Sequence, residues 1–261
     1  MHEEHGSWLK PIYDLLPAST HHFIDHYVVL TWFVIVLLTA LAWAGTRHRA
    51  RVPRGLQTFW EIYVTWVRGF CREQIGEGAE KYAPLLGTLF IYILVMNLLG
   101  LVPGFLTPTM SINVTAALAL SVFFAVQYFG IVTLGPVGYI MHFVGEPLWL
   151  APINIPVHII GELAKPLSLA VRLFGNMFGE ETAIFRMAAL GAALIPFVHV
   201  PIPVHFINVM LHLIIGPIQA FIFFILSAAY IQMVTDGHGH EEHKEHEAHP
   251  AEATMARVDA A

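Results

Sequence analysis

An arginine inside an apolar tract is the residue best placed to do chemistry in this sequence. Arg172 lies in the segment AKPLSLAVRLFGNMFGEE, residues 164–181, within a hydrophobic tract of about residues 157–195. A guanidinium keeps its proton in proteins, and ionised side chains within a bilayer face the protein interior or a water-filled cavity. No acidic residue stands three or four positions from Arg172. We therefore expect a fixed positive charge that acts on a mobile or external carboxylate.

Further polar side chains repeat along the same helical face. At 100° per residue, a polar set falls within a sector of about 120°: His158, Glu162, Lys165, Ser168, Arg172, Asn176 and Glu180. Glu181 falls on the opposite face. We interpret Glu162 and Lys165 as an ion pair near the cytoplasmic end of the helix, with side chains that reach toward the membrane surface. The pattern predicts one polar surface along the helix.

The following tract, about residues 204–235, carries a second polar stripe. His212, Gln219 and Tyr230 fall on one face of a helix. One interpretation is that His212 and Gln219 only hydrogen-bond to a neighbouring helix. The other is that they belong to an ion path, and the register of the two tracts favours this second interpretation.

An antiparallel hairpin centred near Pro196 would bring the two stripes to matching depths. Arg172 would then lie level with Gln219 near the middle of the membrane, and Glu181 level with His212 nearer the outer surface. A carboxylate and an imidazole at one depth can relay protons. The sequence thus predicts a proton entry path that ends at a positive gate.

The composition places these residues in a membrane. Of 261 residues, 56% are hydrophobic and 12% are charged, whereas about a quarter of a soluble domain is charged. The mean hydropathy is +0.64. The chain has no broad basic surface, which argues against nucleic acid as a partner, and its single cysteine, Cys71, excludes an internal disulfide and a cysteine metal cluster. These features predict an all-α polytopic membrane protein.

Five hydrophobic tracts are long enough to cross a bilayer, which requires about 20 apolar residues. They cover roughly residues 27–45, 84–105, 112–134, 157–195 and 204–235. The last two exceed an upright crossing and should form a strongly tilted antiparallel hairpin, with a turn marked by Pro196, Pro201 and Pro203. Glycines and prolines punctuate the connection of residues 135–156. The amphipathic, aromatic-rich segment 56–78 is typical of a helix in the membrane interface.

The basic residues after the first span set the expected orientation. By the positive-inside rule, the cytoplasmic side should receive the arginines Arg47, Arg49, Arg51 and Arg54. With five spans, the N-terminus is then outside and the C-terminus inside. We divide the chain into an extracytoplasmic segment, 1–26, a transmembrane ion-channel domain, 27–235, and a disordered, His-rich cytoplasmic tail, 236–261.

Four segments together resemble a known family. They are KPLSLAVRLFGNMFGEE, LIIGPIQAFIFFILSAAYI, PTMSINVTAALAL, which is similar to the family pattern PTADxNVTxxxAL, and MNLLGLVP. These segments look like subunit a of the membrane sector of F-type ATP synthases. The resemblance covers about residues 84–234 and is most specific around Arg172.

The resemblance implies a stator subunit that forms two proton half-channels against a rotating c-ring, and so couples proton translocation to ATP synthesis or hydrolysis. Arg172 matches the family's essential arginine, which would draw the proton off each arriving c-subunit carboxylate and keep the half-channels separate. The residues that match the outer half-channel and the surroundings of the arginine are Glu181, His212, Asn176 and Gln219. The candidates for the inner half-channel are Glu162, His158, Ser168 and Tyr230.

The same resemblance implies partners and a location. The partners are c-ring subunits, b-type peripheral stalk subunits, the rest of the F-type ATP synthase and the lipid bilayer, in the inner (plasma) membrane of a bacterium. The sequence departs from the family at two positions. His158 stands where many bacterial relatives carry glutamate, and Ser111 replaces the acid of the PTADxNVT segment.

The residues leave two alternative functions to consider. A histidine-box, metal-dependent membrane enzyme would use His22 and His26 together with the histidines of the tail, but the predicted topology places these on opposite sides of the membrane. A secondary ion transporter would show an inverted repeat or paired broken helices, and the sequence has neither. It also has no G-x-x-x-x-G-K-[ST] phosphate loop. We therefore expect a non-catalytic subunit without a cofactor or bound metal.

Overall fold

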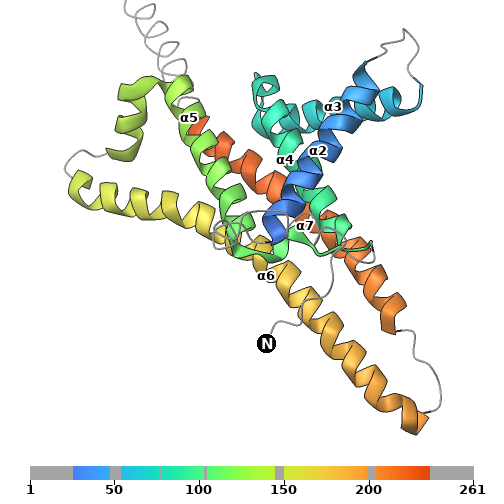
Figure 1. Ribbon diagram of the computed structural model, residues 1–261. Coiled ribbons are helices and arrows are strands. Elements are labelled where there is room, and N and C mark those ends of the chain that lie inside the picture. Colours follow the sequence, from blue (N-terminus) through green and yellow to red (C-terminus); the bar gives the residue numbers. More distant parts are fainter. Residues whose placement is uncertain are drawn as a thin grey trace, which may run out of the picture.

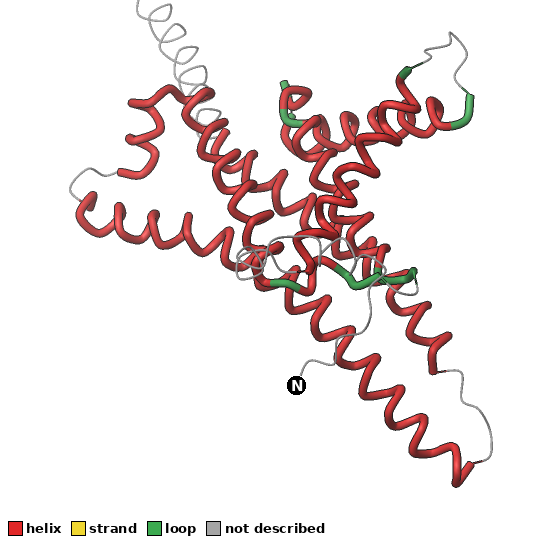
Figure 2. The backbone as a smooth tube through the Cα atoms, in the orientation of Figure 1, coloured by secondary structure: helices red, strands yellow, loops and turns green. Residues whose placement is uncertain are grey.

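The computed structural model describes residues 26–47, 54–76, 78–102, 105–144, 150–198 and 204–235. Over these residues every regular element is helical (Figure 2), which confirms the all-α prediction. The elements are α2 (His26–Thr46), α3 (Leu56–Ile75), η1 (Ala79–Lys81), α4 (Ala83–Leu99), η2 (Pro108–Met110), α5 (Ile112–Val144), α6 (Ala151–Val198) and α7 (Val204–Thr235). The predicted tail, 236–261, and the predicted N-terminal segment apart from His26 lie outside the described residues.

Within the described ranges, three stretches are long and apolar enough to cross a membrane. They are α2, residues Ile112–Tyr139 of α5 and residues Val209–Thr235 of α7. The helix α4 is apolar but has only 17 residues, and α6, which carries the polar stripe, is not one of the three. The chain is a polytopic membrane protein, and each predicted span overlaps one of the helices α2, α4, α5, α6 and α7.

The helix α4 ends at Leu99 and not near residue 105 as predicted. Pro103 disfavours helical conformation in the residue before it, and the chain turns back immediately after the helix. A Cβ on Gly100 would lie 2.1 Å from Thr107 Oγ1. Glycine is therefore required for this close return, which brings η2 against the end of α4.

The helix α5 bends sharply in its second half. Gly135 has φ 72° and ψ 163°, outside the helical region, and Pro136 follows it. A left-handed φ of this kind favours glycine. Beyond the bend the helix continues to Val144 in a new direction (Figure 1). The predicted connection of residues 135–156 therefore begins at the expected glycine and proline, but much of it is helical.

The helices α6 and α7 run in opposite directions (Figure 1), as predicted. The helix α6 runs from Ala151 to Val198, and its 48 residues correspond to about 72 Å at 1.5 Å per residue. The hydrocarbon core of a bilayer is only about 30 Å thick, so a crossing helix of this length requires strong tilt. Pro196 lies inside the last turn of α6, which makes its predicted role in the turn wrong. The connection, residues 199–203, is outside the described residues.

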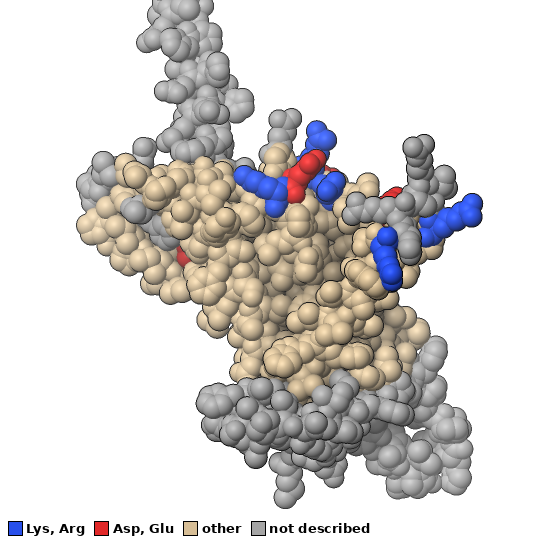
Figure 3. All heavy atoms as spheres, turned by 45° about the horizontal axis from the view of Figure 1, so that its top comes forward, with Lys and Arg blue, Asp and Glu red and all other residues tan. Residues whose placement is uncertain are grey.

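The helix α3 is amphipathic, as predicted. It connects the C-terminal end of α2 to the N-terminal end of α4 (Figure 1). One face packs on the bundle: the ring centroid of Phe70 lies 4.8 Å from that of Phe224 in α7, and Cys71 is buried. On the other face Phe59 and Ile62 are exposed. Figure 3 shows nearly all charged side chains of the visible face gathered at one end, above a broad uncharged surface. This arrangement is typical of a helix that lies along a membrane interface.

Candidate functional site

Arg172 is exposed on α6, and among the described residues it makes no hydrogen bond or ion pair. Its neighbours on this face of the helix are small or polar, and all are exposed: Gly161, Ala164, Ser168, Gly175, Asn176, Gly179 and Ala183. A Cβ added at Gly161, Gly175 or Gly179 would meet nothing within 4 Å. The helix thus presents a smooth strip with one central positive charge, which we name the Arg172 face.

A buried carboxylate–imidazole pair lies two helical turns beyond Arg172. Glu180 Oε1 of α6 is 2.9 Å from His212 Nδ1 of α7, and both residues are buried. Glu181 was predicted to lie level with His212, and its neighbour Glu180 is the residue that makes the contact. Glu180 belongs to the polar stripe, whereas Glu181 is rotated by about 100° from it and is only half-buried.

The second ring nitrogen of His212 determines how many protons this pair holds. His212 Nε2 is 2.7 Å from the backbone oxygen of Asn97. A carbonyl oxygen only accepts hydrogen bonds, so Nε2 must carry a hydrogen. The contact between Nδ1 and Glu180 then requires one more proton, which resides on the imidazole or on the carboxyl group. The pair is therefore built to hold one shared proton.

Asn97 of α4 organises the surroundings of His212, and its side chain is fully buried. Its Nδ2 donates to the backbone oxygen of Gly216 in α7 at 3.0 Å, and its Oδ1 accepts from Thr109 Oγ1 of η2 at 2.8 Å. Asn97 thereby joins α4, α7 and η2 around the imidazole. The sequence analysis missed Asn97 and Thr109 as site residues. The available signal was an amide inside the apolar segment MNLLGLVP.

A hydrogen bond between two amides lies between Arg172 and the Glu180–His212 pair. Asn176 Nδ2 of α6 donates to Gln219 Oε1 of α7. Gln219 is buried, whereas Asn176 is exposed beside Arg172. The predicted register placed Gln219 level with Arg172. The structure instead pairs Gln219 with the residue one turn further along α6.

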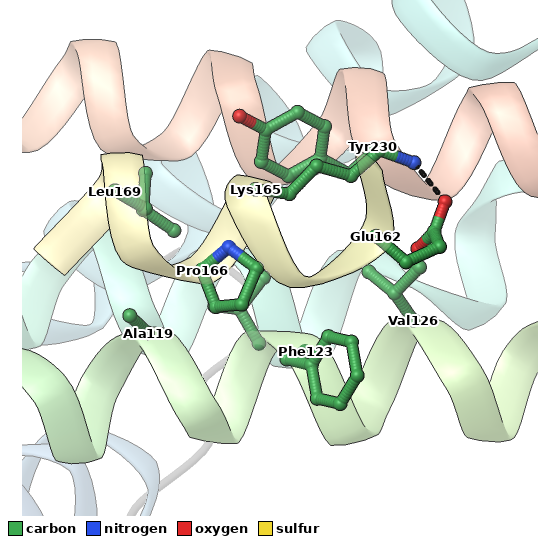
Figure 4. A pocket seen from close by; sticks show the side chains of 9 residues that line it. Ala119, Phe123, Val126, Glu162, Lys165, Pro166, Leu169 and Tyr230 are labelled. Atoms are coloured by element: carbon green, nitrogen blue, oxygen red, sulfur yellow. Dashed lines mark hydrogen bonds and ion pairs between the residues drawn. The ribbon is translucent and has the colours of Figure 1, made fainter. Parts of the chain in front are cut away.

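A second polar cluster lies before Arg172 along α6, and Figure 4 shows its residues Glu162 and Lys165 beside Tyr230. The predicted ion pair between Lys165 and Glu162 is confirmed, and Gln127 Nε2 of α5 donates to Glu162 Oε2 at 3.3 Å. Lys165 Nζ lies 5.6 Å from the ring centroid of Tyr230 in α7. Glu162, Lys165 and Tyr230 line a cavity of about 10 Å³, which is room for roughly one water molecule. Gln127 was not predicted, and the available signal was again an amide inside an apolar tract, SVFFAVQYFGIV.

The remaining predicted residues lie on the surface of α6 outside this cluster. His158 is exposed one turn before Glu162, and Ser168 is exposed on the Arg172 face. Along α6, Glu162 lies about 15 Å before Arg172 and Glu180 about 12 Å after it, at 1.5 Å per residue. Two separate polar clusters therefore flank one fixed charge on a single helix.

The described residues contain no group of three or more His, Cys, Asp or Glu side chains that could hold a metal ion. His22 and the histidines of the tail lie outside the described residues. The chemistry that the described residues can support is proton transfer between carboxylate and imidazole groups, with amides that orient them by hydrogen bonds, next to an exposed guanidinium.

Residues 28–232 match the family described as "ATP synthase A chain". A protein named "ATP synthase subunit a" from Solidesulfovibrio magneticus is 42% identical over 229 residues, which is 88% of this chain and 92% of that protein. A protein named "ATP synthase subunit a 3" from Pelobacter propionicus is 43% identical over 205 residues, 78% of this chain and 85% of the relative. A protein named "ATP synthase subunit a" from Moorella thermoacetica is 41% identical over 211 residues, 81% and 91% of the two chains.

Proposed function

Because the chain belongs to the ATP synthase A chain family, we propose that it is the stator subunit that carries protons between two half-channels and a rotating c-ring. The catalytic chemistry of ATP belongs to other subunits of the complex. Further partners are b-type peripheral stalk subunits and the remaining subunits of an F-type ATP synthase. The histidine-box enzyme and the secondary transporter gain no support from any described residue.

The observation that carries this proposal is the exposed Arg172 face. A guanidinium inside a membrane is costly unless it meets a counter-charge, and the described residues supply none to Arg172. The small residues around it leave room for another helix to approach closely. A c-subunit helix that passes along this face would fill the open space, and its carboxylate would supply the counter-charge. Near the guanidinium the ionised form of that carboxylate is favoured, so it releases its proton there.

The Glu180–His212 pair, together with Glu181, Asn176 and Gln219, would form the outer half-channel. The pair holds one shared proton between Glu180 Oε1 and His212 Nδ1, which are 2.9 Å apart. The Asn176–Gln219 amides continue the polar path toward Arg172. A proton that enters the pair displaces the one already held, which moves toward the c-subunit carboxylate. The fixed charge of Arg172 repels a free proton and prevents direct passage to the other side.

The cluster around Glu162 would form the inner half-channel. Glu162 is held by Gln127 and Lys165, and the cavity beside it can hold a water molecule. A carboxylate and a water molecule next to the exposed strip can accept a proton from the ring and pass it to the aqueous phase. Tyr230 bounds this cavity, whereas His158 and Ser168 lie on the surface that the ring would cover.

The orientation follows from the basic residues near α3. Arg47, Arg54, Arg68, Arg72 and Lys81 are all exposed around the ends of α2, α3 and η1. By the positive-inside rule this end faces the cytoplasm of a bacterial plasma membrane. The N-terminus is then outside and the C-terminus inside. The Glu180–His212 pair would lie toward the outside and Glu162 toward the cytoplasm.

The test is ATP-driven proton pumping in inverted membrane vesicles that contain the assembled complex with Arg172→Ala. We expect coupled pumping to fall to background with normal assembly, because a c-subunit carboxylate would no longer be driven to release its proton. The matched control is Arg72→Ala, which removes an exposed arginine from α3 and should pump as the unmodified complex does. Full pumping by the Arg172 variant would overturn the proposal.

A further inference from the structure

Two neighbouring hollows are lined by residues of α3, on helices other than the one that carries the Arg172 face. One, of about 380 Å³, opens between α2, α3 and α4 and has mainly apolar walls. The other, of about 420 Å³, lies between α2 and α3 and is lined by several polar side chains. Trp60, Val64 and Arg68 line both hollows. The apolar hollow and the polar hollow together therefore suit a molecule that is apolar along its length and polar at one end.

The two hollows follow each other in membrane depth. Along α2, Thr46 at the helix end lines the polar hollow, whereas Ala42 and Leu38 line the apolar hollow up to two turns further into the span. The same end of α2 carries Trp43, with Arg47 Cζ 4.7 Å from its ring centroid. Tryptophan and arginine in this position are typical of the interface between lipid and water. The polar hollow thus lies at headgroup depth and the apolar hollow at acyl-chain depth.

The walls of the apolar hollow are tied together by hydrogen bonds. Trp60 Nε1 donates to the backbone oxygen of Leu41 in α2 at 3.2 Å, and Tyr63 hydroxyl donates to the backbone oxygen of Gly87 in α4 at 2.5 Å. Both donors belong to α3, which therefore bridges α2 and α4 over the hollow. The space is formed by the fold itself and does not require a ligand to open it.

Charged groups follow the order of a phospholipid headgroup. Arg68, at the junction of the hollows, is exposed and has no hydrogen bond or ion pair within the described part of the chain. A guanidinium binds phosphate oxygens with two parallel hydrogen bonds. Glu61, two turns earlier on α3, lines only the polar hollow and accepts a hydrogen bond from Gln57 Nε2 at 2.8 Å. A carboxylate beyond the guanidinium favours an ammonium group linked to the phosphate.

We propose that the two hollows bind one glycerophospholipid with an amine-bearing headgroup, of the phosphatidylethanolamine class. An acyl chain fills the apolar hollow, the phosphate binds Arg68, and the ammonium group lies toward Glu61. The site would hold α3 to α2 and α4 at the membrane interface. It does not depend on the proposed ion path.

The first experiment measures the lipid that stays with the purified complex after extensive detergent washing, by mass spectrometry. Arg68→Gln should reduce bound phosphatidylethanolamine about tenfold or more, because it removes a charge-assisted hydrogen bond to phosphate. Arg72→Gln, one turn further along α3, is exposed and lines neither hollow, so it should retain as much lipid as the unmodified complex. Equal lipid loss in the two variants would overturn the assignment.

A second experiment locates the acyl chain in the assembled complex. Phosphatidylethanolamine with a photoreactive group within its acyl chain should label peptides of α2, α3 and α4 that line the apolar hollow. Thr88→Trp fills this hollow and should abolish the labelling, and the hydroxyl that it removes donates, among the described residues, to the backbone oxygen of Pro84 in the same helix. Val36→Trp adds the same bulk at an exposed position of α2 and should leave the labelling unchanged. Crosslinks from the hollow to a helix of another subunit would show a protein occupant and reject the lipid.

The headgroup is tested by competition between phosphatidylethanolamine and phosphatidylglycerol in vesicles of equal total lipid. The unmodified complex should be enriched in phosphatidylethanolamine, and Glu61→Gln should remove that preference while leaving total bound phospholipid nearly constant. Enrichment in phosphatidylglycerol would show that Glu61 does not face the headgroup and would overturn the amine assignment.

Discussion

The Arg172 face and the Glu180–His212 pair belong to the same helix, two turns apart, and they differ in where their partners lie. Glu180 and His212 are buried and contact each other, with Asn97 as the second acceptor for the imidazole. Arg172 is exposed among small residues and has no partner among the described residues. The buried acid thus finds its imidazole partner within the chain, whereas the exposed arginine requires a counter-charge from another molecule. Mutations in the two regions should therefore fail in different ways.

After the complete loss expected for Arg172→Ala, the largest effects are expected from the buried pair. Glu180→Gln and His212→Gln should each reduce ATP-driven proton pumping by about a hundredfold, the usual contribution of a positioned acid or base. The double variant should be hardly worse than either single one, because the two residues act as a unit. The measurement is the initial pumping rate in inverted vesicles, normalised to the amount of assembled complex.

The control for this pair is Glu181→Gln, which changes the adjacent carboxylate. Because Glu181 is half-buried and does not make the 2.9 Å contact, it should reduce pumping less than Glu180→Gln. A larger effect at Glu181 would restore the pairing expected from the sequence and contradict the structural assignment.

The next largest effect is expected on the Arg172 face, where a larger side chain should reduce pumping without destabilising the folded chain. Gly179→Leu places its side chain in open space, so the chain should accumulate normally. It should nevertheless reduce coupled pumping at least tenfold, because overpacking at a close helix contact costs roughly 1–3 kcal/mol. Gly69→Leu on α3, which also meets nothing within 4 Å, should pump normally. Equal behaviour of the two variants would mean that no partner covers this face.

A smaller effect should follow from loosening the support of His212. Thr109→Val removes the hydroxyl that donates to Asn97 at 2.8 Å while it preserves the shape of the side chain. The imidazole would keep its contacts with Glu180 and Asn97, but Asn97 would be held less firmly. Pumping should fall several-fold, since one buried hydrogen bond is worth about 1 kcal/mol. Thr109→Ser keeps the hydroxyl and should recover most of the activity. A Val variant with full activity would show that the Asn97 network does not position the pair.

The smallest effect is expected at Cys71, a buried residue of α3 that belongs to neither region. Burial raises the pKa of the Cys71 thiol to about 11. At pH 8 the reactive thiolate is then about one part in a thousand, and its amount rises about tenfold for each pH unit up to the pKa. Maleimide labelling of the native complex should be slow and should accelerate after denaturation. Fast labelling at pH 8 would show that α3 does not stay packed on the bundle.

The sequence predicted those parts of the fold and the site that depend on one segment at a time. The period of 3.6 residues placed Glu162, Lys165, Arg172 and Glu180 on one stripe, and the Glu162–Lys165 pair is confirmed. The antiparallel direction of α6 and α7 followed from two apolar tracts joined by a short connection. Both results rest on local geometry, which a single chain reveals.

The contacts between segments could not be predicted in the same way. Choosing between Glu180 and Glu181 requires the rotation of α6 about its axis, which depends on packing against α7 and α4. Asn97, Thr109 and Gln127 enter the two clusters from tracts that are distant in sequence. Pro196 was read as a turn, but prolines are tolerated inside helices in a membrane, and α6 continues through it.

The run of small residues beside Arg172 also has a mechanical consequence. Helices normally lock together because ridges of side chains fit into grooves, and each sideways step then meets a barrier. Where α6 exposes Gly161, Gly175 and Gly179, it has no ridge. A helix that moves across this strip would slide with little friction, and the attraction of one guanidinium would be the main force that marks each step of its travel.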